Sequence, residues 1–298
     1  MAVPEKQLDT WSHQGSVTQS KNTYATIKRA LEDTSANYAS RNFEVFLQGS
    51  YGNDTNVFAE SDVDVVIRYD GAFFSDVRDL PADQQSAFSV CRQDGTYPYY
   101  TFKSHVEAAL VKAFGSSVKP GQKAFKIQAD GSRRAADVVA AFEYRRFYQF
   151  NSWADQRSEI GMAFYTSSNT LIANYPKQHS NNCTTKHQST GGNFKPLVRI
   201  FKNMRSKLVS DGSIGEGVAP SYFIEGLLYN VPDTQFSGTN FGQKVLSILT
   251  WLYQTTDRAN FVCANEQYHL LRDNDPVCWP IANAAQFIDA VIQLWNKW

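Results

Sequence analysis

The chain has 298 residues, a length that predicts about two domains and a sizeable core, since domains usually span about 100–200 residues. Apolar residues make up 42% of it and charged residues 19%, below the roughly 25% of an average chain, which excludes intrinsic disorder. The 29 Lys and Arg balance the 29 Asp and Glu, so no net field draws the protein onto nucleic acid, and non-specific duplex binding is disfavoured.

Neither a membrane span nor a zinc site is predicted. No apolar run approaches the roughly 18–20 residues that cross a bilayer, and the start MAVPEKQLDTWSHQ lacks the apolar core of a signal peptide. We therefore expect a cytoplasmic protein that does not bind membranes. The four cysteines form no C-x-x-C pair and the five histidines have no metal-ligand spacing, so buried free thiols are expected.

The first half of the chain is predicted to mix helices and strands. Residue spacing indicates helices over 22–38 and 103–114, and strands over 43–47, 62–67, 123–128 and 134–143. The first strand ends in a turn at Gly49-Ser50, and a loop containing Gly71, Pro81 and Pro98 precedes the second helix. The dipeptide Asp130-Gly131 joins the last two strands as a hairpin.

The second half is predicted to be helical. Residues 180–193 are polar, contain glycine and have no periodicity, so we expect a surface loop near a domain boundary. Beyond it, periodic apolar residues indicate helices over 195–208, 221–230, 240–254 and 283–298. We therefore expect two domains, residues 1–185 and residues 186–298.

Three aspartates are the candidate catalytic residues. Alternation in the second strand places Asp62 and Asp64 on one face and apolar residues on the other. Two close carboxylates favour a cation between them, and oxygen ligands favour Mg²⁺ or Mn²⁺. Asp137 is the candidate third ligand for two metal ions in an in-line phosphoryl transfer; the alternative is a satisfied structural carboxylate.

The turn before this strand suits a phosphate. Gly49 lets the backbone approach a triphosphate without a clash, and the Ser50 hydroxyl and N–H can donate to a terminal oxygen. Lys202 of the predicted helix 195–208 can reach the same phosphates. The alternative is that Arg199, Lys202 and Arg205 form a solvated helix face.

These residues carry a family resemblance. The runs QGSYGNDTN at 48–56 and ESDVDVV at 60–66 resemble the signature of the DNA-polymerase-β-like nucleotidyltransferases, and more narrowly of the bacterial cGAS/DncV-like nucleotidyltransferases, or CD-NTases. The runs NYPKQH at 174–179, FKPLVRIFKN at 194–203 and PSYFIE at 220–225 are most similar to clade E of that family. The resemblance implies an α+β fold: a polymerase-β-like core of mixed sheet with flanking helices, followed by a helical C-terminal domain.

The resemblance also implies roles for individual residues. Two Mg²⁺ or Mn²⁺ ions would be held by a triad of Asp62, Asp64 and Asp137. The donor triphosphate would be held by Ser50, Lys202 and Ser221, with Gln48 and Gly49 of the same signature also at the substrate. Tyr222 would stack on a nucleobase, and its alternative role is that of an ordinary core aromatic.

Base choice is implied by one asparagine. In clade E an asparagine is associated with accepting a uracil edge, and Asn174 is the residue that aligns there by eye, with Asn181 and Asn182 as nearby alternatives. If Asn174 reads the base, the product is cyclic UMP–AMP or a cyclic dipyrimidine such as cyclic di-UMP.

The resemblance thus implies a monomeric synthase of cyclic oligonucleotide signals in anti-phage defence. Its substrates would be nucleoside triphosphates such as ATP and UTP, its product would act on a separate cyclic-nucleotide-activated effector, and no stable nucleic acid partner is expected. Alternatives in the same chemistry are a purine cyclic dinucleotide synthase and a linear nucleotidyl-adding enzyme. An inactive nucleotide sensor or a toxin–antitoxin-like module is the alternative from another class, and three clustered carboxylates argue against it.

Overall fold

The computed structural model describes residues 2–15, 17–57, 62–275 and 277–298. The chain divides into two compact units that interleave along the sequence. The sheet unit comprises residues 18–48 and 62–176, and the helical unit comprises the described residues of 1–17, 49–61 and 177–298. The division into domains 1–185 and 186–298 stays a prediction.

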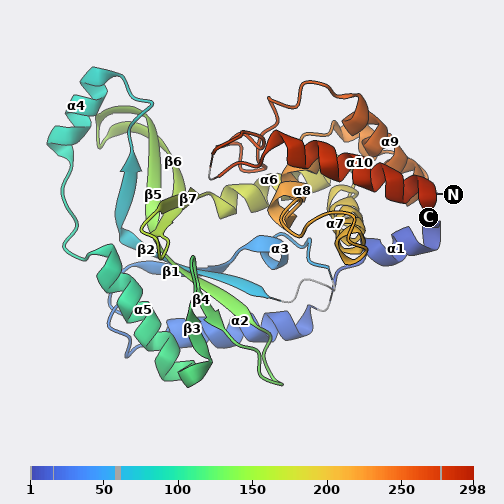
Figure 1. Ribbon diagram of the computed structural model, residues 1–298. Helices are drawn as coiled ribbons and strands as arrows, with labels where there is room; N and C mark the ends of the chain where they lie inside the picture. Colours follow the sequence, from blue (N-terminus) through green and yellow to red (C-terminus); the bar gives the residue numbers. More distant parts are fainter. Residues whose placement is uncertain (1, 16, 58–61, 276) are drawn as a thin grey trace. The chain divides into compact units, whose positions relative to one another are not determined.

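A mixed sheet forms the centre of the sheet unit, as the α+β class predicts (Figure 1). Its strands are β1 (Phe43–Leu47), β2 (Val63–Asp76), β3 (Val118–Pro120), β4 (Phe125–Ile127), β5 (Ala136–Ser152), β6 (Asp155–Tyr165) and β7 (Leu171–Asn174). The order is β1-β2-β5-β4-β3, with β6 paired to β5 and to β7. Only β2 and β5, of the described pairs, run parallel. The first half of β5 is almost continuously buried, as expected for a strand covered on both faces.

Three α-helices flank this sheet among the described residues: α2 (Thr18–Leu31), α4 (Ala82–Cys91) and α5 (Tyr99–Phe114), with a short 3₁₀ turn after α5 (Gly115–Ser117). Helices α2 and α5 contact each other, and they also pack on β2 and β5 respectively (Figure 1). Helix α4 packs on β5 through a small apolar cluster that contains Phe88, Phe147 and Phe150. Helix α4 thus covers the carboxyl-terminal part of β5.

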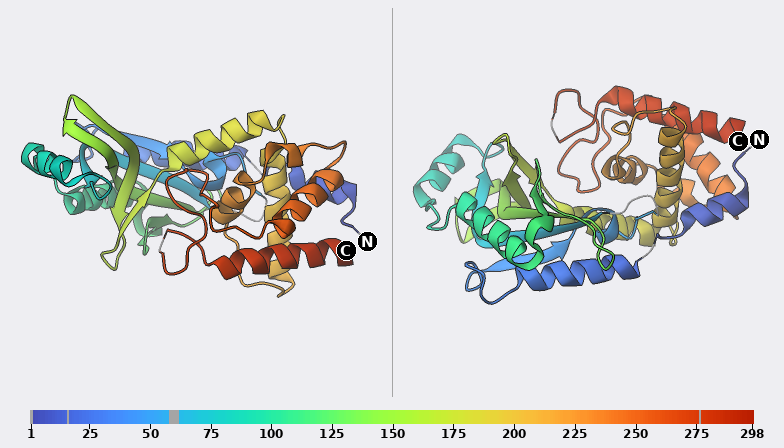
Figure 2. Two further views of the ribbon diagram at one scale, coloured as in Figure 1. Left: turned by 90° about the horizontal axis from the view of Figure 1, so that it is seen from above. Right: turned by 60° about the horizontal axis from the view of Figure 1, so that its bottom comes forward.

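The helical unit contains the remaining helices of the described chain. They are α1 (Glu5–Ser12), α3 (Gly49–Gly52), α6 (Pro176–Ser189), α7 (Phe194–Ser210), α8 (Ser221–Tyr229), the 3₁₀ helix η2 (Asp233–Phe236), α9 (Phe241–Gln254) and α10 (Ile281–Lys297). Helix α10 lies beside α7 and α9 (Figure 2). Large apolar side chains such as Phe201, Phe223 and Phe287 are fully buried in the core of the helical unit. Burial of each stabilises the fold by about 1.5–3 kcal/mol.

The predicted strands and C-terminal helices are confirmed, with shifted ends. Strands 43–47 and 62–67 appear as β1 and the start of β2, and the hairpin at Asp130-Gly131 joins β4 to β5. Helices 195–208, 221–230, 240–254 and 283–298 appear as α7, α8, α9 and α10. Asn240 caps α9, since its Oδ1 accepts the Gln243 N–H at 2.9 Å.

The helix predicted over residues 22–38 is wrong at both ends. Helix α2 begins at Thr18 and its regular part ends at Leu31. Asp33 then accepts the Ser35 N–H at 2.9 Å, which forms a side-chain-stabilised turn in place of another helical turn. Tyr38 is buried beyond this turn, and its hydroxyl donates to the Leu31 carbonyl at 2.9 Å.

Two predicted loops and one turn contain regular structure instead. The loop with Gly71, Pro81 and Pro98 holds the second half of β2 and all of α4, and the two prolines directly precede α4 and α5, where their missing N–H costs nothing. The turn at Gly49-Ser50 is the single helical turn α3. The segment 180–193, predicted to be a surface loop, is mostly helix α6. Burial of His179 and Cys183 on one side stabilises this helix, although its sequence has no apolar periodicity.

No helix in residues 2–15, 17–57, 62–275 and 277–298 is both long and apolar enough to span a lipid bilayer.

Candidate active site

Three aspartates meet on one face of the sheet unit. Asp64 of β2 lies directly opposite Asp137 of β5 in the parallel register, and paired residues of neighbouring strands point to the same face. Asp62 precedes β2 and shares that face by alternation. Asp62 is exposed and the other two are half-buried. Of the predicted triad, Asp64 and Asp137 therefore lie on adjacent strands and Asp62 lies just before the first of them.

The electrostatics show that these charges interact. Burial is the main cause that raises the pKa of Asp137; the Lys126 ammonium lowers it, and the Asp62 charge raises it further. Lys126 is the antiparallel partner of Asp137 on β4. This oxygen-only, mutually repelling donor set fits hard divalent cations such as Mg²⁺ or Mn²⁺.

The Gly49-Ser50 motif opens α3 in the helical unit. Gly49 has φ 66°, a backbone conformation that favours glycine. The carbonyls of Gly49 and Ser50 accept the N–H groups of Asn53 at 3.1 Å and of Thr55 at 2.9 Å. Gln48, the last residue before the motif, belongs to the sheet unit, where its N–H donates to the Asp64 carbonyl at 3.0 Å. Gln48 Oε1 is buried and has no hydrogen-bond partner within the described residues.

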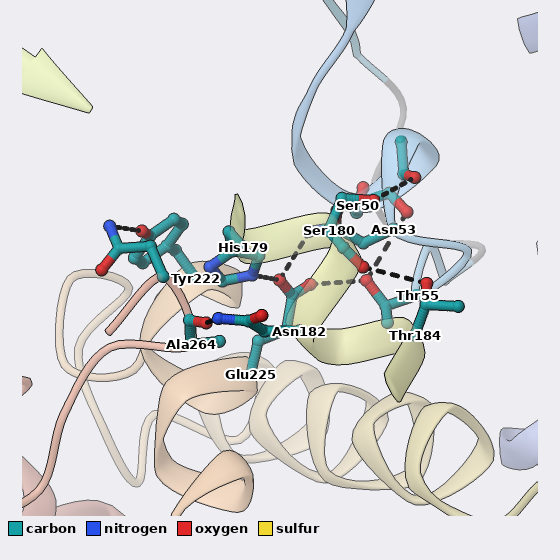
Figure 3. Close-up of polar contacts among 12 residues, drawn as sticks. Ser50, Asn53, Thr55, His179, Ser180, Asn182, Thr184, Tyr222, Glu225 and Ala264 are labelled. Atoms are coloured by element: carbon teal, nitrogen blue, oxygen red, sulfur yellow. Dashed lines mark hydrogen bonds and ion pairs between the residues drawn. The ribbon is translucent and has the colours of Figure 1, made fainter. Parts of the chain in front are cut away.

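A buried polar network, here called the Glu225 network, joins the segment after α3 to helices α6, α7 and α8. Figure 3 shows its contacts from Glu225 to Asn53, Thr55 and His179. Its members are Asn53, Thr55, His179, Lys202 and Glu225. Glu225 Oε2 lies 2.9 Å from Asn53 Nδ2 and 2.6 Å from His179 Nε2. Glu225 Oε1 accepts from Thr55 Oγ1 and, at 2.9 Å, from Lys202 Nζ.

Lys202 is fully buried, which excludes the solvated helix face for this residue. Its ammonium donates to Thr55 Oγ1 at 3.1 Å and to Glu225. The two neighbouring arginines of α7 also bind protein oxygens, since Arg199 donates to the Ser12 and Asp54 carbonyls and Arg205 to the Ala219 carbonyl. The cationic face of α7 is therefore a set of internal contacts.

Ser221 and Tyr222 open α8 directly after Pro220. The half-buried Tyr222 ring stacks on Trp279 with centroids 5.6 Å apart, and lies 4.2 Å from the His179 ring. Its hydroxyl accepts from Asn265 Nδ2 at 2.9 Å. Ser50, Lys202, Ser221 and Tyr222 thus all belong to the helical unit, whereas the aspartates belong to the sheet unit.

Comparison with known proteins covers the whole chain. Residues 181–296 match the family model described as the cGAS/DncV-like nucleotidyltransferase C-terminal helical domain. The chain is 37% identical to the cyclic nucleotide synthase CdnE01 of Staphylococcus haemolyticus, covering 100% of both chains, and 39% identical to the cyclic UMP-AMP synthase of Rhodothermus marinus, covering 100% of this chain and 99% of that one.

The chain belongs to the cGAS/DncV-like nucleotidyltransferases.

A solved structure agrees with this family. The Rhodothermus marinus CdnE c-UMP-AMP synthase, solved with Apcpp and Upnpp, superimposes with a TM-score of 0.88 at 37% identity, covering 99% of this chain and 97% of that one. The CD-NTase fold and nucleotidyltransferase activity expected from the sequence are thereby confirmed. The family implies dependence on a divalent metal, which the oxygen donors of the three aspartates fit.

The residue expected to read a base lies in the sheet unit of this CD-NTase. Asn174 ends β7, is half-buried, and accepts the Tyr175 N–H on its Oδ1 at 2.8 Å. Of the alternatives, Asn182 donates to the Ala264 carbonyl at 2.8 Å and Asn181 is exposed. Base reading by Asn174 stays a prediction.

A second cluster has metal-ligand residue types. Ligand atoms of His179, Cys183 and Glu225 lie within 4.8 Å of one another, in the described part of the chain. Burial, with the Glu225 charge, raises the pKa of the Cys183 thiol well above its usual range, so the thiolate that binds metals is disfavoured. Glu225 already accepts from four side chains, including an ammonium, so the cluster is a hydrogen-bond network.

Sequence reasoning assigned no role to Asn53, Thr55, His179 or Glu225, although each lies in a run quoted for the resemblance. One signal was present: Glu225 is the single charged residue in the apolar helix sequence SYFIEGLLY. A charge at such a position is almost never fully buried unless it is paired. The four cysteines are free; Cys183 and Cys263 are buried as expected, whereas Cys91 and Cys278 are only half-buried.

Proposed function

We propose that this CD-NTase joins two nucleoside triphosphates into a cyclic dinucleotide that contains at least one pyrimidine, with cyclic UMP–AMP as the first candidate and cyclic di-UMP as the second. Similarity over the full length to a cyclic UMP-AMP synthase supports this choice. The observation that carries the proposal is the register of β2 and β5, which places Asp64 opposite Asp137 with Asp62 close by.

Asp62, Asp64 and Asp137 would hold two divalent ions, Mg²⁺ or Mn²⁺. When bound, such ions polarise the donor α-phosphate and stabilise the charge on the attacking and leaving oxygens. Three carboxylates on one face are otherwise mutually repulsive, so the fold is organised for cationic partners at this position.

Asp137 would serve as the proton acceptor. Its carboxylate lies opposite Asp64 on the neighbouring strand, at the position proposed for the reacting groups. Transfer of the acceptor hydroxyl proton to Asp137 lets that oxygen bond to the donor α-phosphorus, while the bond to pyrophosphate breaks. A linear dinucleotide forms first; its remaining triphosphate is then attacked by the other hydroxyl, releasing a second pyrophosphate and closing the ring.

The substrate-binding roles would follow from the chemistry of each side chain. Gln48, Gly49, Ser50, Lys202 and Ser221 would hold the donor triphosphate, because hydroxyls, backbone N–H groups and an ammonium suit phosphate oxygens. Tyr222 would stack on a nucleobase. Asn174 would bind a uracil edge, since a carboxamide offers both donors and an acceptor.

The deciding experiment is a product assay. Purified protein is incubated with ATP, GTP, CTP and UTP and with Mg²⁺ or Mn²⁺, treated with phosphatase and analysed by mass spectrometry. We expect a phosphatase-resistant cyclic dinucleotide with at least one pyrimidine. Purine rings alone would support the purine cyclic dinucleotide alternative, and phosphatase-sensitive chains would support a linear nucleotidyl-adding enzyme.

The biological setting is part of the same proposal. We expect a monomeric cytoplasmic enzyme whose product activates a separate effector during phage infection. Light scattering after size exclusion tests the monomer. Bacteria that carry the gene with its neighbouring genes should lose protection from phage when Asp62 and Asp64 are replaced by asparagine.

A further inference from the structure

We propose that Glu225 is the positioning residue for donor triphosphate binding, because it holds both the Gly49-Ser50 turn and the Lys202 ammonium in place. This inference rests on the proposed function, in which Ser50 and Lys202 bind the triphosphate. Every contact used below lies within the helical unit.

The Glu225 carboxylate is fully occupied by protein donors. A carboxylate has about four acceptor positions, and Oε1 and Oε2 each receive two partners. The residue is 1% exposed. A buried charge without partners is very costly, so a stable fold needs a donor at each acceptor position of this carboxylate.

The charge state of Glu225 is settled by its neighbours. Burial acts to raise the pKa of Glu225, but the Lys202 charge and the hydrogen bonds from His179 and Thr55 outweigh it, and the pKa lies well below its usual range. The group is therefore a carboxylate throughout the physiological range, and it offers acceptors only.

Glu225 reaches the Gly49-Ser50 turn through two residues. The side chains of Asn53 and Thr55 donate to Glu225, as Figure 3 shows, while their backbone N–H groups donate to the carbonyls of Gly49 and Ser50. Side chain and backbone of the same two residues thus connect the carboxylate to the turn. Losing the carboxylate would free this segment to move and with it the Ser50 N–H and hydroxyl.

Glu225 also determines where the Lys202 ammonium lies. Lys202 Nζ donates to Glu225 and to Thr55 Oγ1, so the same carboxylate places the cation beside the Gly49-Ser50 segment. The carboxylate therefore positions the Lys202 side chain for the phosphate contact proposed above.

Binding measurements on hydroxyl variants test the positioning role. We expect Thr55→Val to weaken binding of a non-hydrolysable UTP analogue about tenfold, the effect of losing one hydrogen bond to a charged group. Thr55→Ser keeps the hydroxyl and should restore most of the affinity. Glu225→Gln should weaken binding at least as much, because the amide nitrogen of glutamine would face hydrogen-bond donors in place of a carboxylate oxygen that accepts from them. Calorimetric titration measures each dissociation constant, and thermal unfolding confirms that each variant is folded.

Kinetics separate positioning from a purely structural role. In Glu225→Gln, KM for the triphosphate should rise by about the same factor as the dissociation constant, with a smaller change in kcat. Adding Thr55→Val to Glu225→Gln should cost little more, because both act through one network. The exposed Glu216 is the matched control, and Glu216→Gln should leave both constants unchanged.

The possible results are distinct. Equal affinity of Thr55→Ser and Thr55→Val, or wild-type affinity in a folded Glu225→Gln protein, overturns the positioning role. If Glu225→Gln does not fold, the two Thr55 variants decide. Wild-type protein that binds the analogue but forms no cyclic product contradicts the proposed function and leaves the binding test of Glu225 valid.

Discussion

Asp62, Asp64 and Asp137 place three negative charges on one face of the sheet unit. Packing does not require them there, since Asp62 is exposed and the other two are only half-buried, while the apolar residues of β2 face the core. Charges that repel one another are retained where a ligand offsets them. The role of these aspartates is therefore best tested by substitutions that remove the charge and keep the shape of the side chain.

We predict that replacing Asp62 and Asp64 together by asparagine abolishes product formation and leaves the fold intact. The amides keep the shape but lose the charge that holds cations, and removing like charges does not destabilise the sheet. Radiolabelled triphosphates measure turnover and thermal unfolding reports the fold, with Asp83→Asn on the exposed face of α4 as the control. Retained turnover in the double variant would contradict the assignment.

We predict that Asn174→Ser shifts base preference from uracil towards purines. Serine is shorter and loses the carboxamide donors that match a uracil edge, although its hydroxyl can still accept the Tyr175 N–H. Mass spectrometry of products from mixed triphosphates measures the shift. Asn182→Ser is the matched control, because Asn182 already donates to the Ala264 carbonyl. A shift in the Asn182 variant instead would move the base reader there.

At the scale of elements, β2 and β5 are held together beyond the aspartates by side chains at the end of β2. Asp76 accepts from Arg78 at 2.7 and 2.9 Å and from the Tyr144 hydroxyl of β5 at 2.9 Å. The hydrogen bonds from Arg78 outweigh burial and, with that from Tyr144, lower the pKa of Asp76 to about 2. An ion pair and a hydrogen bond to Asp76 thus link the two parallel strands at one end.

The interactions of Asp76 predict that the stability of the fold falls in acid. Because the folded pKa of Asp76 lies below its ordinary value, its contribution is present above about pH 4 and is lost as the pH falls towards 2. We expect Asp76→Asn to lower stability at neutral pH by about 1–2 kcal/mol, less than the full shift implies because Arg78 is largely exposed. Thermal unfolding at several pH values should show the difference from wild type shrinking below pH 4. A constant difference would contradict it, and Asp83→Asn serves again as control.

At the scale of the whole molecule, equal numbers of acidic and basic residues govern encounters with large polyanions. Arginines of the helical unit such as Arg199 and Arg205 are engaged with protein acceptors. Counterion release by clustered cations is the main source of non-specific nucleic acid binding. The balance therefore favours small nucleotide substrates over a duplex.

We predict that duplex DNA neither binds nor changes the rate of product formation. Fluorescence anisotropy of a labelled duplex at about 50 mM salt, where electrostatic binding is strongest, tests binding, and the product assay with and without DNA tests rate. Affinity that falls steeply with rising salt, or DNA-dependent synthesis, would contradict this prediction.

Local patterns determined much of this protein. Alternation placed Asp62 and Asp64 on one face, and helical periodicity located α7 to α10, because both follow from spacing along the chain. Motif order indicated the CD-NTase family. Asp137 was named from its strand position, and the parallel register then paired it with Asp64.

Tertiary structure alone decided the rest. Helix α6 is too polar to be recognised locally and is stabilised by burying His179 and Cys183. The Glu225 network joins residues up to 172 positions apart, and no spacing rule reports a contact at that separation. Lys202 has the sequence pattern of an exposed cation, yet its burial depends on a carboxylate from another helix. Hydrogen bonds between distant side chains are satisfied only once the chain has folded.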